Sequence, residues 1–148
     1  MSVLWFDGLL TQIADAGVYF MPDADVEELL EAAAINCFPC LRVNLRGCTG
    51  RQDLLLRIAG VLDFPPHVTA DWAGLSSALS ALPGLGTRGL VLLLEASDEF
   101  RAAATDDFKT AMETLQAASA QWARCKLPLW SFIVLDEVQF DALEEPSP

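Results

Sequence analysis

The sequence contains a single histidine, His67, among its 148 residues. A hydrolytic triad needs a histidine beside a serine or cysteine nucleophile and an orienting acid, but His67 follows Pro65 and Pro66 in a predicted loop. The chain also lacks a Walker loop. Its GLGTRG stretch (84–89) lies between a predicted helix and a predicted strand, the reverse of the dinucleotide-binding order. We therefore expect no catalytic residues and no enzymatic activity.

Long apolar runs are also absent. A membrane helix needs ~18 apolar residues with few charges, whereas the longest runs here, GLVLLLE and LPLWSFIVL, have the length of buried strands. The N-terminus MSVLWFDGLL has no basic residue and reaches an acid at Asp7, unlike a secretory signal. The sequence thus predicts a cytoplasmic protein that does not bind membranes.

Positive charge is missing from both ends of the chain. Residues 1–41 contain seven acids and no Lys or Arg, residues 136–148 contain five acids and no Lys or Arg, and the stretch between holds nine of each sign. The net charge of −12 therefore belongs to the ends. We expect no binding of nucleic acid, whose phosphates require Lys and Arg. The acidic field would attract a basic protein; solubility alone is the alternative explanation.

Cysteine is scarce, but two of the four cysteines form a Cys-x-x-Cys motif, Cys37 and Cys40. A redox motif is expected at a helix start, where the thiol pKa is lowered, yet this one leads into a predicted strand, LRVNL. A zinc site needs four ligands, and the one histidine is distant. We expect free thiols, no metal and no cofactor, with thiol redox chemistry as the alternative from the enzyme class.

Strand and helix patterns alternate along the chain. Strands are predicted at 41–45, 90–95 and 129–135, and the last two are apolar on both faces, as strands covered by helices on both sides should be. GVYFM (17–21) is a candidate for a further edge strand. This alternation predicts a small parallel α/β sheet with right-handed crossovers.

Four of the helices have start signals. A helix at 71–82 is expected to begin near Asp71, with Trp72 facing inward. Capping boxes or caps predict the starts of the other three helices, at Asp25 with Glu28, at Thr49 with Gln52, and at Thr105.

Four stretches, taken in order, carry a resemblance to a known family: LRVNLRGCTGRQDLLLRIAGVLDFP, DWAGLSSALSAL, GLVLLLEASDEF and DFKTAMETLQAASAQWARCKLPLWSFIVL. Together they resemble the barstar family, small intracellular inhibitors of secreted ribonucleases. The resemblance implies an α/β fold, with a small parallel three-stranded sheet packed with helices and an N-terminal β/α extension. The chain is then a single domain, 1–148, in which extension 1–38 packs on a barstar-like part, 39–148.

The resemblance also implies a binding surface at the loop and helix after Phe64. In the family this surface is acidic, and its carboxylates stand in for RNA phosphates. Here Ala73 and Ser77 occupy the positions of the two helix carboxylates, and a further family acid falls near Ala117. The implied partner-binding residues are therefore mostly small ones: His67, Thr69, Asp71, Ala73, Gly74, Ser76, Ser77 and Ser80.

The function implied by the resemblance is stoichiometric inhibition. The protein would be a bacterial immunity protein that binds and neutralises a cognate ribonuclease or toxin, a basic protein that the missing carboxylates suggest is unlike barnase. The alternative is a non-inhibitory protein-interaction module or a self-associating barstar-like domain, which would use the small-residue face or the apolar VLWF at 3–6.

Overall fold

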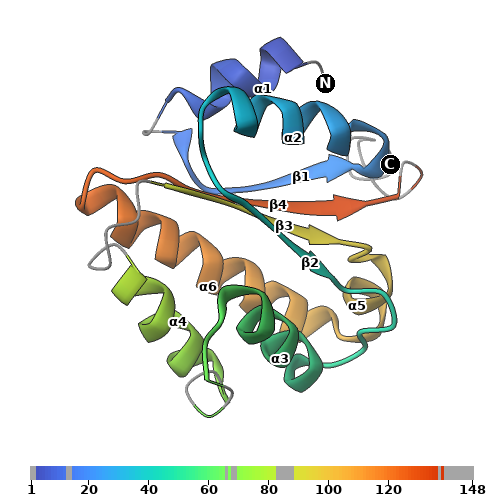
Figure 1. Ribbon diagram of the computed structural model, residues 1–148. Helices are drawn as coiled ribbons and strands as arrows, with labels where there is room; N and C mark the ends of the chain where they lie inside the picture. The colour runs from blue at the N-terminus through green and yellow to red at the C-terminus, as the bar shows by residue number, and fades with distance from the viewer. Residues whose placement is uncertain are drawn as a thin grey trace, which may run out of the picture.

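A parallel sheet of four strands, in the order β1-β4-β3-β2, runs through the middle of the computed structural model (Figure 1). All three strand pairings are parallel. The strands are β1 (Val18–Pro22), β2 (Cys40–Asn44), β3 (Leu90–Glu95) and β4 (Leu129–Leu135). The structure describes residues 3–12, 15–65, 67, 70–82, 89–136 and 138.

Helices cover both faces of the sheet (Figure 1). One face carries α1 (Val3–Leu10) and α2 (Val26–Ile35), and the short 3-10 turn η2 (Asp23–Asp25) leads from β1 into α2. The other face carries α3 (Arg51–Leu62), α4 (Trp72–Ala81), α5 (Asp98–Ala103) and α6 (Thr105–Arg124). None of the described helices is long and apolar enough to cross a membrane.

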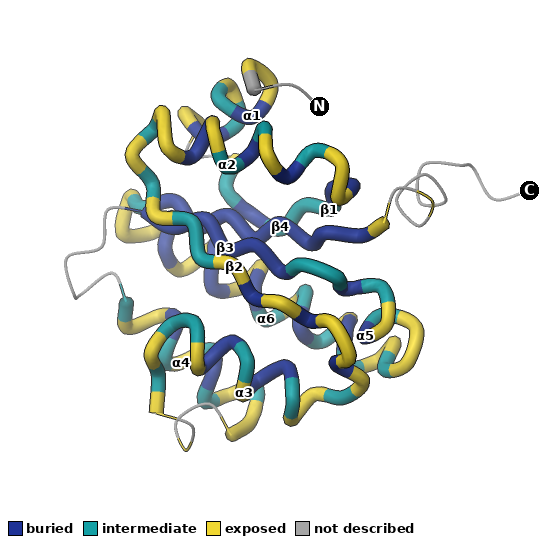
Figure 2. Tube along the Cα trace, turned by 45° about the vertical axis from the view of Figure 1, so that its right-hand side comes forward, coloured by how far each residue is buried: buried dark blue, intermediate teal, exposed yellow. Residues whose placement is uncertain are grey.

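The two faces of the sheet bury two separate apolar clusters, because successive side chains of a strand point to opposite sides. Toward α3, α4 and α6, the central strands point Leu92, Leu94 and Ile133 into one cluster, which also contains the fully buried Trp122. Toward α1 and α2 they point the alternate residues, which pack with Phe6 and Met21: Val91, Leu93, Trp130, Phe132 and Val134. Figure 2 shows β3 and β4 as the buried centre between the two helical layers.

The predicted strands are present. β3 and β4 match the predicted 90–95 and 129–135 to the residue, and β2 lies one residue before the predicted 41–45. The candidate edge strand GVYFM supplies β1, which pairs with β4. The sheet therefore has four strands, because the extension adds one to the edge of the implied three. The sequence did not predict α1.

Two predicted caps near the middle and end of the chain are wrong. α3 begins after Gly50 rather than after Thr49, and no side chain caps it. α6 begins at Thr105 itself, whose hydroxyl donates to the carbonyl oxygen of Arg101, 3.1 Å away. The reason is local, since only Ala104 separates α5 from α6 and Thr105 therefore stands over the last turn of α5.

The predicted capping box of α2 is also wrong, because the expected hydrogen bond from the capping side chain does not form. Asp25 does occupy the N-cap position, but its side chain makes no capping hydrogen bond. Instead η2 runs directly into α2, and the Val26 N–H donates to the Asp23 carbonyl oxygen. The preceding turn thus takes up a donor that a capping side chain otherwise accepts.

Candidate functional site

The chain turns sharply at the end of α3, ahead of the implied binding helix. Asp63 follows α3 in the left-handed conformation, with φ 59°, and the Phe64 N–H donates to the carbonyl oxygen of Ala59, 2.8 Å away. A left-handed residue at this position is a common way to end a helix. Phe64 packs against the core and Pro65 cannot continue the helix. The chain therefore leaves α3 at a fixed point.

Asp71 fixes the start of α4. It lies at the N-cap position, and its Oδ1 accepts a hydrogen bond from the Gly74 N–H at 2.7 Å. This bond satisfies one of the unpaired donors of the first turn, and such caps stabilise a helix by about 1 kcal/mol. One oxygen of Asp71, which the family resemblance assigns to partner binding, is thus used within the chain.

A buried hydrogen bond fixes the other end of α4. The Trp122 indole of α6 donates from Nε1 to the carbonyl oxygen of Leu79 at 2.9 Å. Leu79 belongs to the last turn of α4, where carbonyl groups do not accept the usual hydrogen bond from four residues ahead. Leu75 and Leu79 are buried, and Trp72 is half-buried against the same cluster. α4 is therefore held at both ends and along its inner face.

The outer side of α4 is neutral and made of small side chains. Ala73, Ser77 and Ser80 are exposed, whereas Gly74 and Ser76 are half-buried. The helix WAGLSSALSA contains no ionisable side chain. His67 and Asp71 are also exposed, and Thr69 lies outside the described residues. This face can contact a partner closely through shape and hydroxyl groups, but it offers no free carboxylate from α4 itself.

Ala117, near the implied third acid position, lies elsewhere. It is exposed on α6 and lines an apolar groove of about 600 Å³ together with Val18 and Phe20 of β1. Trp122, which contacts α4, is five residues further along α6 and so lies about 140° around the helix. The structure therefore separates Ala117 from the outer face of α4.

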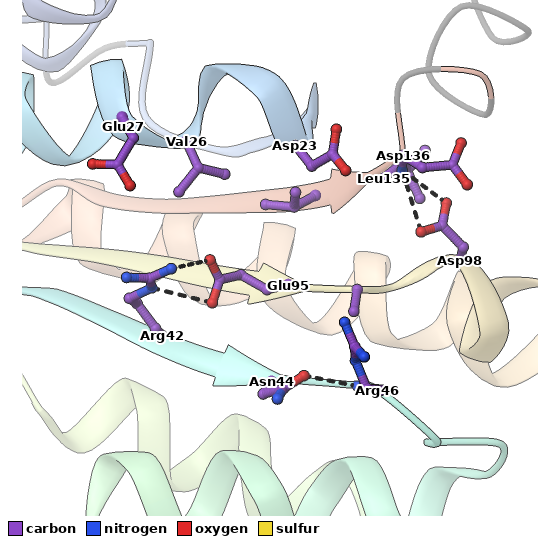
Figure 3. A pocket seen from close by; sticks show the side chains of 12 residues that line it. Asp23, Val26, Glu27, Arg42, Asn44, Arg46, Glu95, Asp98, Leu135 and Asp136 are labelled. Carbon is purple, nitrogen blue, oxygen red and sulfur yellow. Dashed lines mark hydrogen bonds and ion pairs between the residues drawn. The ribbon is translucent and has the colours of Figure 1, made fainter.

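A polar cleft of about 560 Å³ lies at the carboxyl ends of the strands (Figure 3). In it, the Arg42 guanidinium of β2 donates two hydrogen bonds to the Glu95 carboxylate of β3, at 2.6 and 3.1 Å. Asp98 accepts the Asp136 N–H at 3.0 Å. The Glu95 carboxylate is therefore engaged in an ion pair with Arg42.

The strand connections explain why the cleft forms. After β1 the chain crosses to α2 on one face, whereas after β2 and β3 it crosses to α3 and α5 on the other. Chains that diverge in this way leave a crevice outside the carboxyl ends of a parallel sheet. The sequence analysis missed this cleft, although Arg42 and Asn44 alternate in LRVNL and so share one face of β2.

The Cys-x-x-Cys motif does not have the environment of a redox site. Cys40 opens β2, and burial, with a smaller contribution from Glu95, raises the pKa of its thiol to about 11 even though Arg42 opposes the shift. Reactive thiols need a lowered pKa. The cysteines at 37, 40, 48 and 125 are free, and within the described part of the chain no three His, Cys, Asp or Glu residues could hold a metal.

Comparison with known proteins identifies the family. Residues 38–134 match the family model described as Barstar (barnase inhibitor), which is about two thirds of the chain. The chain belongs to the barstar family. No curated protein matches it. Barstar proteins are inhibitors rather than enzymes, so membership implies an inhibitor-like or immunity-type role and, in general, a ribonuclease as partner.

The barstar match covers α4 completely but the polar cleft only in part. It runs from the end of the extension through β2, the four helices α3 to α6 and most of β4, and it includes α4 with its cap. α1, β1 and α2 lie outside it. The cleft is shared, since Arg42 and Glu95 come from the barstar part and Asp23 and Glu27 come from the extension.

Proposed function

We propose that this protein is a stoichiometric inhibitor of the barstar type, an immunity protein that binds a cognate ribonuclease or another protein toxin and blocks it. The barstar match carries the proposal, because it includes the whole of α4 and the turn before it. In this role the protein catalyses no reaction, and it acts only by presenting a rigid surface that is complementary to its partner.

The architecture of α4 supports this role. A binding surface loses less conformational entropy on association when it is already ordered, and α4 is ordered by the Asp71 cap and by the Trp122 hydrogen bond to Leu79. Its small outer residues bring a partner's backbone close, and serine loses little rotamer freedom on burial. Rigidity and close approach therefore replace the carboxylates that family members use.

The surface chemistry of α4 selects the partner. A neutral face of Ala73, Ser77 and Ser80 cannot neutralise the cluster of Arg and Lys in a barnase-like active site. We therefore propose a cognate enzyme or toxin whose contact surface is neutral where it meets α4. The acidic ends of the chain add a long-range attraction toward a partner of basic overall charge.

The test is an inhibition titration with the protein that co-purifies from the native cell. That protein should have ribonuclease or another toxic activity, and the activity should fall to an end point at one equivalent. Ser77→Arg should weaken inhibition at least a hundredfold, because a tightly packed interface would bury the new charge unpaired. Ala123→Arg, an exposed small residue in the last turn of α6, is the matched control and should inhibit normally.

Two results would reject parts of the proposal. Lack of inhibition by the wild-type protein would reject the inhibitor role. Wild-type inhibition by Ser77→Arg, with an unchanged melting temperature in both variants, would instead show that α4 is not the contact surface.

A further inference from the structure

Exposed apolar side chains gather where α1 meets the end of α2. Leu4 is 82 %, Ile35 59 % and Trp5 47 % exposed. The Asn36 side chain donates to the Asp7 carboxylate at 2.8 Å, which ties the end of α2 to the middle of α1. Leu4 lies one turn before Asp7 on α1, and Ile35 directly precedes Asn36 at the end of α2. We call Leu4, Trp5 and Ile35 the apolar corner.

The apolar corner is unusual for a helix at the surface. The inner side of α1 already buries Phe6 and Leu10 completely, and one apolar side is enough to hold a helix to a domain. Yet its outer side is apolar as well, and Figure 2 shows exposed stretches on both α1 and α2. Exposed apolar groups that cluster in this way mark a contact surface, whereas single ones are ordinary.

Acidic side chains continue from the apolar corner along α2. The exposed residues Glu27, Glu31 and Ile35 are spaced by four and therefore form one line along the helix. Neither Glu27 nor Glu31 forms an ion pair with another described residue, although Glu27 adds to the effect of Glu95 in raising the pKa of the Arg42 guanidinium. The first Lys or Arg of the chain is Arg42, so residues 1–41 supply no cation to neutralise this line. We call Glu27 and Glu31 the acidic line.

The acidic line ends at the cleft. Glu27 lies at its rim, across from the Arg42–Glu95 ion pair (Figure 3). Arg42 is neutralised by Glu95, and five acids against two arginines line the cleft as a whole. Its volume of about 560 Å³ is ample for one long side chain. Apolar corner, acidic line and acidic cleft thus follow one another on the same side of the sheet.

We infer that this surface binds a basic amphipathic segment of a protein partner. Apolar side chains of the segment would cover Leu4 and Ile35, and its Lys or Arg side chains would pair with the acidic line and enter the cleft. Charge favours this occupant, because a second copy or an anionic lipid surface would bring like charges together. The surface lies across the sheet from α4, so the inference does not rest on the proposed inhibition.

The probe for the test is a fluorescent 14-residue helical peptide with Leu on one face and Lys on the other. The wild-type protein should bind it saturably at low salt, and more weakly as salt rises. Leu4→Ser/Ile35→Ser should weaken binding at least tenfold, because two exposed apolar anchors are lost. Glu27→Gln/Glu31→Gln should weaken it about tenfold at low salt and less at high salt.

Two matched controls test whether a loss of peptide binding is specific to this surface or follows from removing any exposed apolar or acidic side chain. Leu56→Ser removes a 55 % exposed leucine from α3, and Asp106→Asn/Glu113→Gln removes two exposed acids from α6. Both controls should bind the peptide within twofold of wild type. Equal losses in test and control variants, or no saturable binding by the wild type, would overturn the inference.

Two further measurements address the other occupants. Sedimentation of the protein alone should give a monomer; a dimer abolished by Leu4→Ser/Ile35→Ser would assign the surface to a second copy and reject the basic segment. Co-flotation with phosphatidylcholine or phosphatidylserine vesicles should be absent. Vesicle binding that depends on Leu4 would assign the surface to a membrane and likewise reject the inference.

Discussion

The indole Nε1 of Trp122 and the carbonyl oxygen of Leu79 form a buried hydrogen bond of 2.9 Å that joins α6 to the last turn of α4. The same carbonyl oxygen also accepts the Leu82 N–H. Trp122 is fully buried, so the bond lies in the core rather than at its rim. The position of the implied binding helix is therefore coupled to the central packing of the domain.

Trp122→Phe should lower the free energy of unfolding by about 2 kcal/mol, because it removes both this hydrogen bond and part of a buried ring. Trp130→Phe is the matched comparison. Trp130 is equally buried, but its Nε1 has no hydrogen-bond partner among the described residues, so losing that donor should cost less. Urea unfolding of the two variants measures the difference, and equal losses would contradict the role assigned to the Trp122 bond.

Trp72→Ala should lower the free energy of unfolding by about 2 kcal/mol. The sequence predicted an inward ring, and a fully buried one typically costs 3–5 kcal/mol to remove. In the structure Trp72 is only half-buried against the core, which reduces the cavity left behind. Thermal unfolding checks the value; a loss below about 0.5 kcal/mol would mean that the ring serves the surface rather than the core.

The Arg42–Glu95 ion pair should contribute less than about 1 kcal/mol to stability. Its two hydrogen bonds are short, but the side chains are 50 % and 22 % exposed, and water screens such pairs. A double-mutant cycle with Arg42→Met and Glu95→Gln isolates their coupling. A coupling above about 2 kcal/mol would show that water is excluded from this ion pair more completely than the exposure of its two side chains indicates.

Cys40 should make stability fall at high pH. Burial raises the pKa of its thiol from the ordinary value of 9 to about 11, so the folded state favours the protonated form. The stability associated with this thiol is present below pH 9 and is lost as pH rises from 9 toward 11. Stability curves of wild type and Cys40→Ala should therefore diverge in that window. Parallel curves would indicate that Cys40 is freely accessible to water.

The rate of alkylation provides an independent test of how far the Cys40 thiol is ionised. Thiolate is the reactive form, and at pH 8 a pKa of about 11 leaves roughly one Cys40 in a thousand ionised. Iodoacetamide should therefore modify the exposed Cys37 and Cys125 well before Cys40. Peptide mapping by mass spectrometry gives the order, and early modification of Cys40 would be inconsistent with its burial.

Deletion of residues 1–37 should leave an insoluble or unfolded chain. The deletion removes α1, β1 and α2, and thereby uncovers the face formed by Val91, Leu93, Trp130, Phe132 and Val134. Contiguous apolar surface of this kind drives aggregation. The intact chain should unfold in one cooperative transition, as a single domain does. A soluble, folded 38–148 fragment would show that the extension is a separable addition.

The parallel sheet could be predicted from sequence because its central strands carry an unambiguous signal. LVLLLE and LWSFIVL are apolar at every position but one, and residues of that kind must be covered on both faces. The exact positions of the edge strands β1 and β2 were harder to predict. β1 and β2 are only five residues long and half-buried in places, so a shift of one residue changes little apolar area.

Helix α1 could not be predicted because the cause of its folding is not local, whereas the predicted caps failed because neighbouring turns and helices take the place of the capping side chains. VLWFDGLL has only eight residues and an internal Gly8, and isolated helices of that length are unstable. It forms because Phe6 and Leu10 are buried in the cluster that α1 shares with α2 and the sheet. The outer side of α4 was predictable from helical spacing, whereas the cleft depends on crossovers that bring Glu27 over Arg42 from distant parts of the sequence.

The pairing of β1 with β4 sets an order for folding during synthesis. β1 lies near the start of the chain, but its neighbour in the sheet is the last strand. A nascent chain therefore carries its N-terminal segment unpaired until β4 has left the ribosome, whereas β2 and β3 can pair earlier. Throughout that interval Phe6 and Met21 lack their partners Trp130, Phe132 and Val134 on β4, which leaves the extension with exposed apolar side chains until that strand is synthesised.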